Sequence, residues 1–331
     1  MTGKACCTPA RRDAAQAREL AEPHARSAGQ AREFSAEAES GHAGLDGDQA
    51  PSLEFISLPG GAFVMGSNDP DGLPADGEGP AREVTVSPFR IAPITVTNAQ
   101  FANFVRATGY VTQAEEAGSS FVFYLQVPAG VRSRIRQYPS GLPWWLEVPD
   151  ACWQRPAGPG SSIRDRQDHP VVHVSWDDAQ AYCQWAGVRL PTEAQWEFAA
   201  RGGLARQRYP WGNDLPEPPP CNIWRGTFPH QPAERWTPET VPVRSFKPNA
   251  FGLYCMAGNV WEWCEDWFSP HYHGTTESHD PVQRMPTGRR SARGGSFLCH
   301  DSYCNRYRVA ARGSNTPDSS SSNQGFRVVS S

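Results

Sequence analysis

Residues 252–263 read GLYCMAGNVWEW, and this stretch decides the fold because it places three aromatic rings and two glycines within twelve positions. The whole chain of 331 residues has the same character: 30 glycines and 31 prolines accompany 12 Trp, 15 Phe and 9 Tyr. Aromatic side chains bury large apolar areas, whereas Gly and Pro interrupt helices and strands. We therefore predict an α+β domain with little regular secondary structure, whose core consists of rings beneath irregular loops.

Composition excludes several classes of protein. Hydrophobic residues make up 38% and charged residues 20%, which is enough for a folded core. The net charge of −4 argues against a dedicated nucleic-acid-binding protein. No apolar run approaches the length of a membrane span, and the first residues lack the apolar stretch of a secretory signal. We expect a cytoplasmic monomer with neither nucleic-acid nor membrane partners.

The chain divides into two compositional zones. Residues 1–51 are rich in Ala, Glu, Arg, Gly and Ser, and Phe34 is their only aromatic residue. Such a segment buries too little apolar surface to offset the entropy of ordering, so we predict a disordered tail. Residues 52–331 are predicted to form one folded domain. Its long loops are acceptable if they are functional or held by metal ions.

Local signals predict a few short elements. Each of three segments begins with a Ser or Thr that can cap a helix, continues with apolar residues on one helical face, and ends at a Gly. In two of them an Asp or Gln follows the cap by three residues, as in a capping box. These signals predict helices over about 97–109, 175–187 and 192–202. Residues 53–58 and 61–66 predict a hairpin with glycines at its turn, and residues 326–329 predict a closing strand.

The densest group of reactive side chains surrounds Cys299 and Cys304. The two lie five positions apart, which places them on opposite faces of a strand or about 140° apart on a helix. Their side chains can converge only if the intervening backbone turns. A pair of thiolates suits Cu(I), whereas structural zinc requires four ligands, and the nearby His300, Arg306 and Arg308 would favour the thiolate form. The alternative is that both are simply buried core cysteines.

Other candidate sites are weaker. His169 and His173 are four residues apart, but no glutamate accompanies them as in zinc proteases, so we interpret them as structural histidines. Seven arginines between residues 284 and 312 accompany one acidic residue, Asp301, which predicts a solvated or anion-facing surface or a groove for an acidic partner. The chain contains neither a G-x-S-x-G nor a P-loop motif, which excludes those hydrolase and nucleotide-binding chemistries.

Several motifs resemble the formylglycine-generating enzyme (sulfatase-modifying factor) family, prokaryotic type. The most discriminating are CHDSYCNRYR at residues 299–308 and NTPD at 315–318. The resemblance covers about residues 52–329 in the family's order. Its other motifs are residues 61–66, 96–98, 189–194, 252–263, 293–297 and 325–327.

The resemblance implies a C-type-lectin-like fold stapled by Ca²⁺. It also implies an oxidase that converts the Cys of a Cys-x-Pro-x-Arg segment in an unfolded sulfatase to Cα-formylglycine, with O₂ and a thiol reductant. Cys299 and Cys304 would hold Cu(I), and Ser296 and Trp261 would line the oxygen pocket. The other implied residues are Ser120, Trp144, Tyr303 and Asn323 for the peptide groove, Asn222, Ile223, Glu234 and Trp236 for a first calcium site, and Gly258, Val260 and Glu262 for a second. The donor chemistry suits Ca²⁺.

Three positions depart from the family pattern. Cys255 replaces the usual Asn, which removes an oxygen ligand from the second calcium site. Ser119 stands where some members have an acidic residue that pairs with the substrate arginine. Cys183 keeps a cysteine that forms a disulfide in secretory-pathway members, but the partner position is Val328, in agreement with a reducing compartment.

Two other functions compete with the oxidase. The first is a non-catalytic peptide- or ligand-binding module on the same fold, in which both cysteines are merely buried. The second, an iron-dependent C–S-bond-forming oxidase of the ergothioneine-synthase type, is excluded because the chain lacks the required His-x₃-Glu-x-His motif.

The predicted tail itself contains a Cys-x-Pro-x-Arg segment, residues 7–11, which read CTPAR. The match is either a coincidence of composition, or the tail is a substrate of the same chain or an occupant of the groove in cis.

Overall fold

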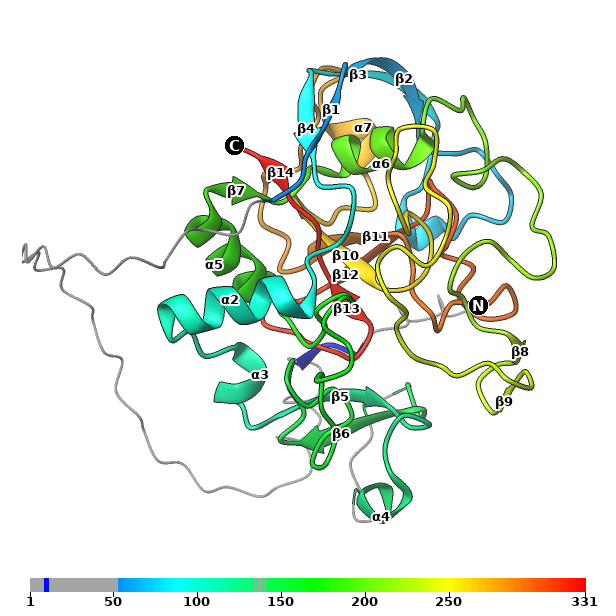
Figure 1. Ribbon diagram of the computed structural model, residues 1–331. Coiled ribbons are helices and arrows are strands. Elements are labelled where there is room, and N and C mark those ends of the chain that lie inside the picture. The colour runs from blue at the N-terminus through cyan, green and yellow to red at the C-terminus, as the bar shows by residue number, and fades with distance from the viewer. Residues whose placement is uncertain (1–8, 12–52, 134, 136–138, 140) are drawn as a thin grey trace, which may run out of the picture.

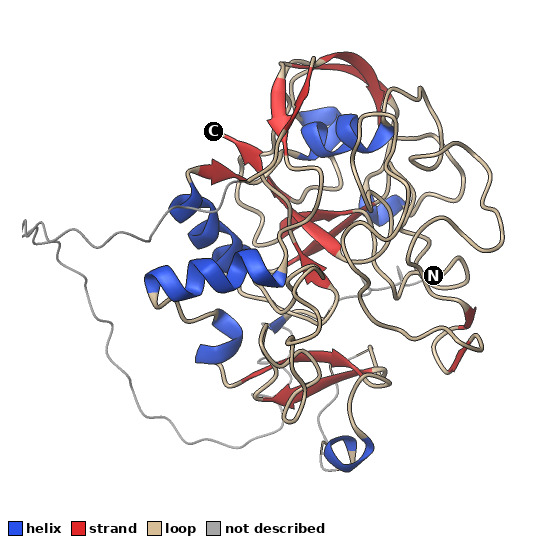
Figure 2. Cartoon of the chain, viewed as in Figure 1, coloured by secondary structure: helices blue, strands red, loops and turns tan. Residues whose placement is uncertain are grey.

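The computed structural model describes residues 9–11, 53–133, 135, 139 and 141–331. Loops connect short strands and helices throughout this part of the chain (Figure 2), as the Gly and Pro content predicts. The strands are β1 (Ile56–Leu58), β2 (Gly61–Met65), β3 (Arg82–Val86), β4 (Phe89–Ile91), β5 (Ser119–Phe123), β6 (Trp145–Pro149), β7 (Val188–Arg189), β8 (Gly226–Thr227), β9 (Gln231–Pro232), β10 (Trp261–Trp267), β11 (Arg290–Arg293), β12 (Arg312–Asn315), β13 (Gln324–Gly325) and β14 (Val329–Ser330). The helices are the 3₁₀ turn η1 (Pro74–Asp76), α2 (Asn98–Thr108), α3 (Gln113–Glu116), α4 (Ala129–Arg132), α5 (Trp176–Ala186), α6 (Glu193–Arg201) and α7 (Tyr272–Thr275).

A four-stranded sheet, ordered β12-β11-β10-β13, lies at the centre of the molecule (Figure 1). β10 pairs antiparallel with β11 and parallel with β13. A second sheet, ordered β1-β4-β14-β7, includes the C-terminal strand, and β2-β3, β5-β6 and β8-β9 form two-stranded sheets. The central register places Glu262 opposite Arg293 and Trp261 beside Gln324. The loops that follow β11 and precede β13 therefore meet at the start of β10.

The three predicted helices are confirmed. α2, α5 and α6 each begin after a complete capping box, formed by Thr97, Ser175 and Thr192 respectively. Each ends at a glycine in the left-handed conformation, where the absence of a Cβ removes the steric penalty. Local sequence signals were sufficient here because both ends of each helix are satisfied within its own residues.

The predicted hairpin is wrong. β1 pairs with β4, and β2 pairs with β3, so the two segments belong to different sheets. Gly60 lies between them with φ +68°, and a Cβ there would lie 2.3 Å from the carbonyl oxygen of Val86. The glycine thus redirects the chain at a close backbone contact instead of closing a two-stranded turn. The predicted closing strand is also shorter than expected, because only Val329 of that stretch lies in β14.

Aromatic side chains fill the core, as predicted. Six tryptophans are at most 2% exposed: Trp145, Trp153, Trp196, Trp224, Trp261 and Trp263. A fully buried aromatic side chain removes about 150–250 Å² from water, worth roughly 4–6 kcal/mol as an upper bound. This burial stabilises the loops that cover the core. No helix among the described residues is long and apolar enough to cross a membrane.

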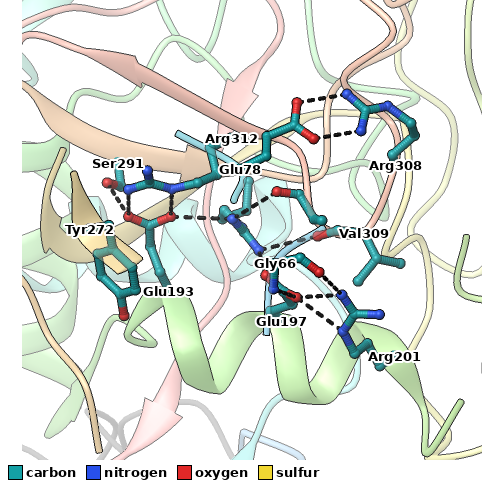
Figure 3. Close-up of polar contacts among 12 residues, drawn as sticks. Gly66, Glu78, Glu193, Glu197, Arg201, Tyr272, Ser291, Arg308, Val309 and Arg312 are labelled. Carbon is teal, nitrogen blue, oxygen red and sulfur yellow. Dashed lines mark hydrogen bonds and ion pairs between the residues drawn. The ribbon is translucent and has the colours of Figure 1, made fainter. Parts of the chain in front are cut away.

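The arginine-rich stretch is not an anion-facing surface, contrary to prediction. Arg293 and Arg312 are fully buried, and they pair with Glu193 and Glu197 of α6 (Figure 3). Glu193 accepts hydrogen bonds from Arg312 Nε and NH2 at 2.7 and 2.6 Å. Burial alone would raise the pKa of Glu193, but Arg312 and Arg293 hold it at about 2. The arginines are thus internal partners of carboxylates that lie about 100 residues earlier in the chain, a relationship that local sequence does not reveal.

Candidate functional site

Cys299 and Cys304 are both buried, and the backbone between them turns. The amides of Tyr303, Cys304 and Asn305 all donate to the carbonyl oxygen of His300, at 3.1, 3.0 and 3.0 Å. Cys299 Sγ accepts a hydrogen bond from the Ser296 amide at 3.4 Å. The turn that convergence of the two side chains requires is therefore present, and the assignment of a metal to them stays a prediction.

Arg306 and Arg308, which were predicted to favour the thiolate form, are both engaged by carboxylates. Arg306 binds the carboxylate of Asp76 at 2.6 and 3.1 Å, and Arg308 binds that of Glu78 at 2.5 and 2.7 Å. Each guanidinium charge is compensated by a carboxylate, so neither provides net positive charge for a thiolate. These ion pairs instead anchor both sides of the loop that follows Cys304.

Ser296, Trp261 and Asn323 meet at the start of β10, in agreement with the register of the central sheet. The side-chain amide of Asn323 donates to Ser296 Oγ at 2.9 Å, and its backbone carbonyl accepts from the Trp261 amide at 2.9 Å. Ser321 Oγ donates to Asn323 Oδ1 at 2.8 Å, which fixes the orientation of the amide. Because Ser296 also contacts Cys299, four residues predicted from the family resemblance form one connected cluster.

Trp144 and Tyr303 form an aromatic wall together with Phe228, which sequence reasoning missed. Tyr303 stacks on Phe228 with centroids 4.8 Å apart, and its ring lies edge-on to Trp144 at 4.9 Å. Both predicted residues are only half-buried, so part of this wall faces solvent. Such a surface suits an extended peptide, whose proline and aliphatic groups pack on rings.

Ser120 lies in a buried polar cluster with His173 and Ser320. His173 Nε2 lies 2.8 Å from the Pro156 carbonyl and must donate to it, so Nδ1 is the acceptor for Ser120 Oγ at 2.7 Å. Burial lowers the pKa of His173 to about 4 and keeps the ring neutral. His169 instead contacts Thr240 at 2.9 Å. The interpretation of both histidines as structural is confirmed, but the contact of His173 with a predicted groove residue carried no sequence signal.

The second predicted calcium site does not fit calcium. The Glu262 carboxylate receives Arg327 Nε at 2.6 Å, Arg327 NH2 at 2.8 Å and Trp196 Nε1 at 2.7 Å, so its charge and both oxygens are engaged. Burial raises the pKa of the Cys255 thiol to about 12, which leaves a neutral sulfur where an oxygen ligand was needed. Gly258 and Val260 lie beside Glu262 in the same buried stretch.

The first predicted calcium site combines a buried and an exposed half. Asn222 and Ile223 are buried, and the Asn222 amide donates to the Glu239 carbonyl at 2.9 Å. Glu234 is exposed, and Trp236 packs edge-on against Trp224 at 5.2 Å. Within the described residues, no group of three or more His, Cys, Asp and Glu side chains is arranged to hold a metal ion. A site here would depend on backbone carbonyls as well as Glu234.

Residues 44–331 match the family model described as a sulfatase-modifying factor enzyme 1-like domain. The chain is 57% identical over 284 residues to a formylglycine-generating enzyme of Thermomonospora curvata, covering 83% of this chain and 92% of that protein. It is also 47% identical over 283 residues to an inactive C-alpha-formylglycine-generating enzyme 2 of Bos taurus, covering 84% and 88%. The solved structure of PvdO from Pseudomonas aeruginosa superposes with a TM-score of 0.62 at 25% identity, covering 84% and 94%. The fold expected from the resemblance is confirmed, whereas its stapling by Ca²⁺ stays a prediction.

Proposed function

Because the chain belongs to the sulfatase-modifying factor enzyme 1-like family, we propose that it converts the cysteine of a Cys-x-Pro-x-Arg segment in an unfolded sulfatase to Cα-formylglycine. The observation that carries the proposal is the cluster of Cys299, Ser296, Asn323 and Trp261, beside the turn that leads to Cys304. Dioxygen would be the oxidant and a thiol the reductant. In balanced form, the substrate –CH₂–SH, O₂ and two thiols give –CHO, H₂S, a disulfide and water.

Cys299 and Cys304 would hold Cu(I), because two sulfur donors on one turn suit a soft ion of low coordination number. When bound, copper would supply an affinity for the substrate sulfur and the electron-transfer chemistry with dioxygen that side chains lack. The chain's own residues would do the rest. Ser296 and Asn323 would orient polar groups at the reacting centre, and the buried indole of Trp261 would exclude water from it. Trp144, Tyr303 and Ser120 would bind the peptide.

The test is aerobic incubation of the copper-loaded protein with a peptide containing Cys-Thr-Pro-Ser-Arg and excess thiol, followed by mass spectrometry. We expect conversion of the peptide cysteine to the aldehyde and its abolition in Cys304→Ser. Cys255→Asn is the matched control, because it also removes a cysteine and Asn tolerates the backbone φ of +51° there. Failure of conversion by a folded, copper-loaded protein would reject the proposal.

The competing function is a non-catalytic peptide-binding module on the same fold. An inactive relative at 47% identity supports keeping it as the second candidate. Copper stoichiometry distinguishes the two: the oxidase requires about one tightly bound Cu(I) per chain that is lost in Cys299→Ser, whereas the binding module requires none.

We also propose one structural Ca²⁺ at Asn222, Ile223, Glu234 and Trp236. Bound ions stabilise the folded state by mass action. Added Ca²⁺ should raise the Tm of the protein relative to chelator, and Glu234→Gln should remove that increase, whereas Glu83→Gln, an exposed substitution on β3, should leave it unchanged.

A further inference from the structure

Three residues of the predicted tail pack against the folded domain. Pro9 and Ala10 are buried and Arg11 is half-buried, whereas Cys7 and Thr8 lie outside the described residues. In Figure 1 the dark blue segment, residues 9–11, lies beside β5. A buried position for a segment of this composition requires specific contacts, because its own apolar surface is too small to hold it.

Three hydrogen bonds, with residues from two separate parts of the chain, hold this segment. The Asn315 side-chain amide donates to the Pro9 carbonyl at 2.9 Å, and the Arg11 amide donates to Ser319 Oγ at 2.8 Å. The Arg11 guanidinium donates to the Ser119 carbonyl at 2.7 Å. Asn315 and Ser319 are at most 1% exposed. Buried polar groups of this kind are costly unless they are paired, so this surface is built to receive a peptide backbone and an arginine.

The same surface continues into the candidate functional site. Ser119 precedes the predicted groove residue Ser120 in β5, and Ser120 Oγ lies 2.8 Å from Ser320 Oγ. The loop that contains Ser319 runs on through three serines to Asn323, which contacts Ser296. The spacing of Pro9 and Arg11 is that of the Pro and Arg in the Cys-x-Pro-x-Arg substrate segment.

We propose that Pro9 and Arg11 occupy, in cis, the subsites that take the proline and arginine of the polypeptide substrate, so that the N-terminal segment competes with sulfatases for the groove. The inference rests on the proposed function. The arginine of the segment is recognised although Ser119 replaces an acidic residue. The Ser119 backbone carbonyl accepts from the guanidinium, and the Glu147 carboxylate accepts from Ser119 Oγ at 2.8 Å and adds negative charge nearby.

Covalent attachment gives the segment an advantage over free peptide. A tethered ligand acts at a raised effective concentration, without any stronger contact. Loss of the Arg11 guanidinium removes its charge-assisted hydrogen bond to the Ser119 carbonyl. Removal of Arg11 should therefore free the groove and strengthen the binding of peptide added in trans.

The test measures binding without catalysis. A fluorescent peptide containing Ser-Thr-Pro-Ser-Arg, which has no reactive cysteine, is titrated with the full-length protein and followed by anisotropy. We expect Arg11→Ala to lower the Kd of the peptide at least about threefold relative to wild type. The Kd of Arg11→Lys should lie between those of Arg11→Ala and wild type. Arg106→Ala, which removes the same charge from the exposed face of α2, is the control and should match wild type.

The outcomes separate this inference from the proposed function. Equal Kd values in wild type, Arg11→Ala and Arg106→Ala, or weaker binding in Arg11→Ala, would overturn occupancy in cis and leave the peptide groove intact. The absence of peptide binding in every variant would overturn the proposed function itself. With the cysteine-containing peptide, KM should fall in Arg11→Ala because the competing segment no longer occupies the groove. The value of kcat should stay the same, because saturating substrate displaces the segment in the wild type as well.

Discussion

Glu262 and Arg327 form a buried ion pair in which two nitrogens meet two oxygens, at 2.6 and 2.8 Å. Arg327 also donates to the carbonyls of Ala92, Pro93 and Tyr254, so the pair joins the central strand β10 to the segment after β4 and to the C-terminal segment. A carboxylate paired in this way holds segments together, and the positive charge of Arg327 beside it opposes the binding of a metal ion.

Glu262→Gln should destabilise the protein by about 3–5 kcal/mol, because it leaves Arg327 buried with an uncompensated charge. The free energy of unfolding in urea measures the effect. The control is Glu54→Gln, which breaks the 2.6 Å pair with Arg244, whose side chains are 63% and 44% exposed. That change should cost only about 0–1 kcal/mol. Equal losses in the two variants would contradict the role assigned to burial.

Gly313→Ala should impair catalysis by displacing Trp261. A Cβ at Gly313 would lie 2.8 Å from two atoms of the indole ring, a distance that real contacts do not reach, so the ring must shift. We expect at least about a tenfold loss of kcat/KM for the Cys-Thr-Pro-Ser-Arg peptide, since small displacements in active sites are costly. Gly274→Ala, where no atom lies within 4 Å of the new Cβ, is the control. Unchanged kcat/KM in Gly313→Ala would remove Trp261 from the site.

The contribution of His173 to stability should fall as the pH falls from about 6.5 to 4, whereas Asp266, whose pKa burial raises to about 7, contributes in the opposite direction. Burial lowers the pKa of His173 from 6.5 to about 4, so the unfolded chain binds more protons than the folded chain in this window. The contribution of His173 to the free energy of unfolding, up to roughly 3 kcal/mol, is fully present above pH 6.5 and is lost as the pH falls through 4. Burial lowers the pKa of His273 to about 4 as well, and it acts in the same direction.

His173→Asn tests this assignment, because Asn tolerates the φ of +60° at this position and does not titrate. Urea unfolding at pH 7.5 and pH 5 should show a smaller loss on acidification than in wild type. His271→Asn, at an exposed position, should keep the wild-type difference. A full wild-type loss in His173→Asn would assign the acid sensitivity to other groups.

Glu147→Gln should weaken recognition of the substrate arginine. The change keeps an acceptor for Ser119 Oγ but removes the negative charge next to the carbonyl that receives the guanidinium. The Kd of the Ser-Thr-Pro-Ser-Arg peptide should rise about threefold to tenfold, with little change for a peptide in which Gln replaces Arg. Both titrations are made in the Arg11→Ala background. An equal effect on the two peptides would show that Glu147 does not read the arginine.

The parts of the fold that local chemistry determines were predictable from sequence. α2, α5 and α6 carry their caps within their own residues, and the aromatic core follows from composition. The hairpin prediction failed at Gly60, because its conformation is set by a distant carbonyl, that of Val86. The prediction of an arginine-rich surface failed for the same reason, because the carboxylates that pair with these arginines lie far away in the chain. In the site, the family motifs located Ser296, Asn323 and Asn315, but Phe228, Ser319 and the contact of Asn315 with Pro9 become visible only when the loops are assembled.

The ion pairs of Arg306 with Asp76 and of Arg308 with Glu78 join residues 230 positions apart. A ribosome adds about 5–20 residues per second, so roughly 10–50 s pass between the synthesis of each carboxylate and that of its guanidinium. During this time Asp76 and Glu78 lack the guanidinium groups that compensate their charges in the folded chain, and the nascent chain cannot complete the loop that follows Cys304. The cysteine cluster is therefore among the last parts of the molecule to form, only after nearly the whole chain has left the ribosome.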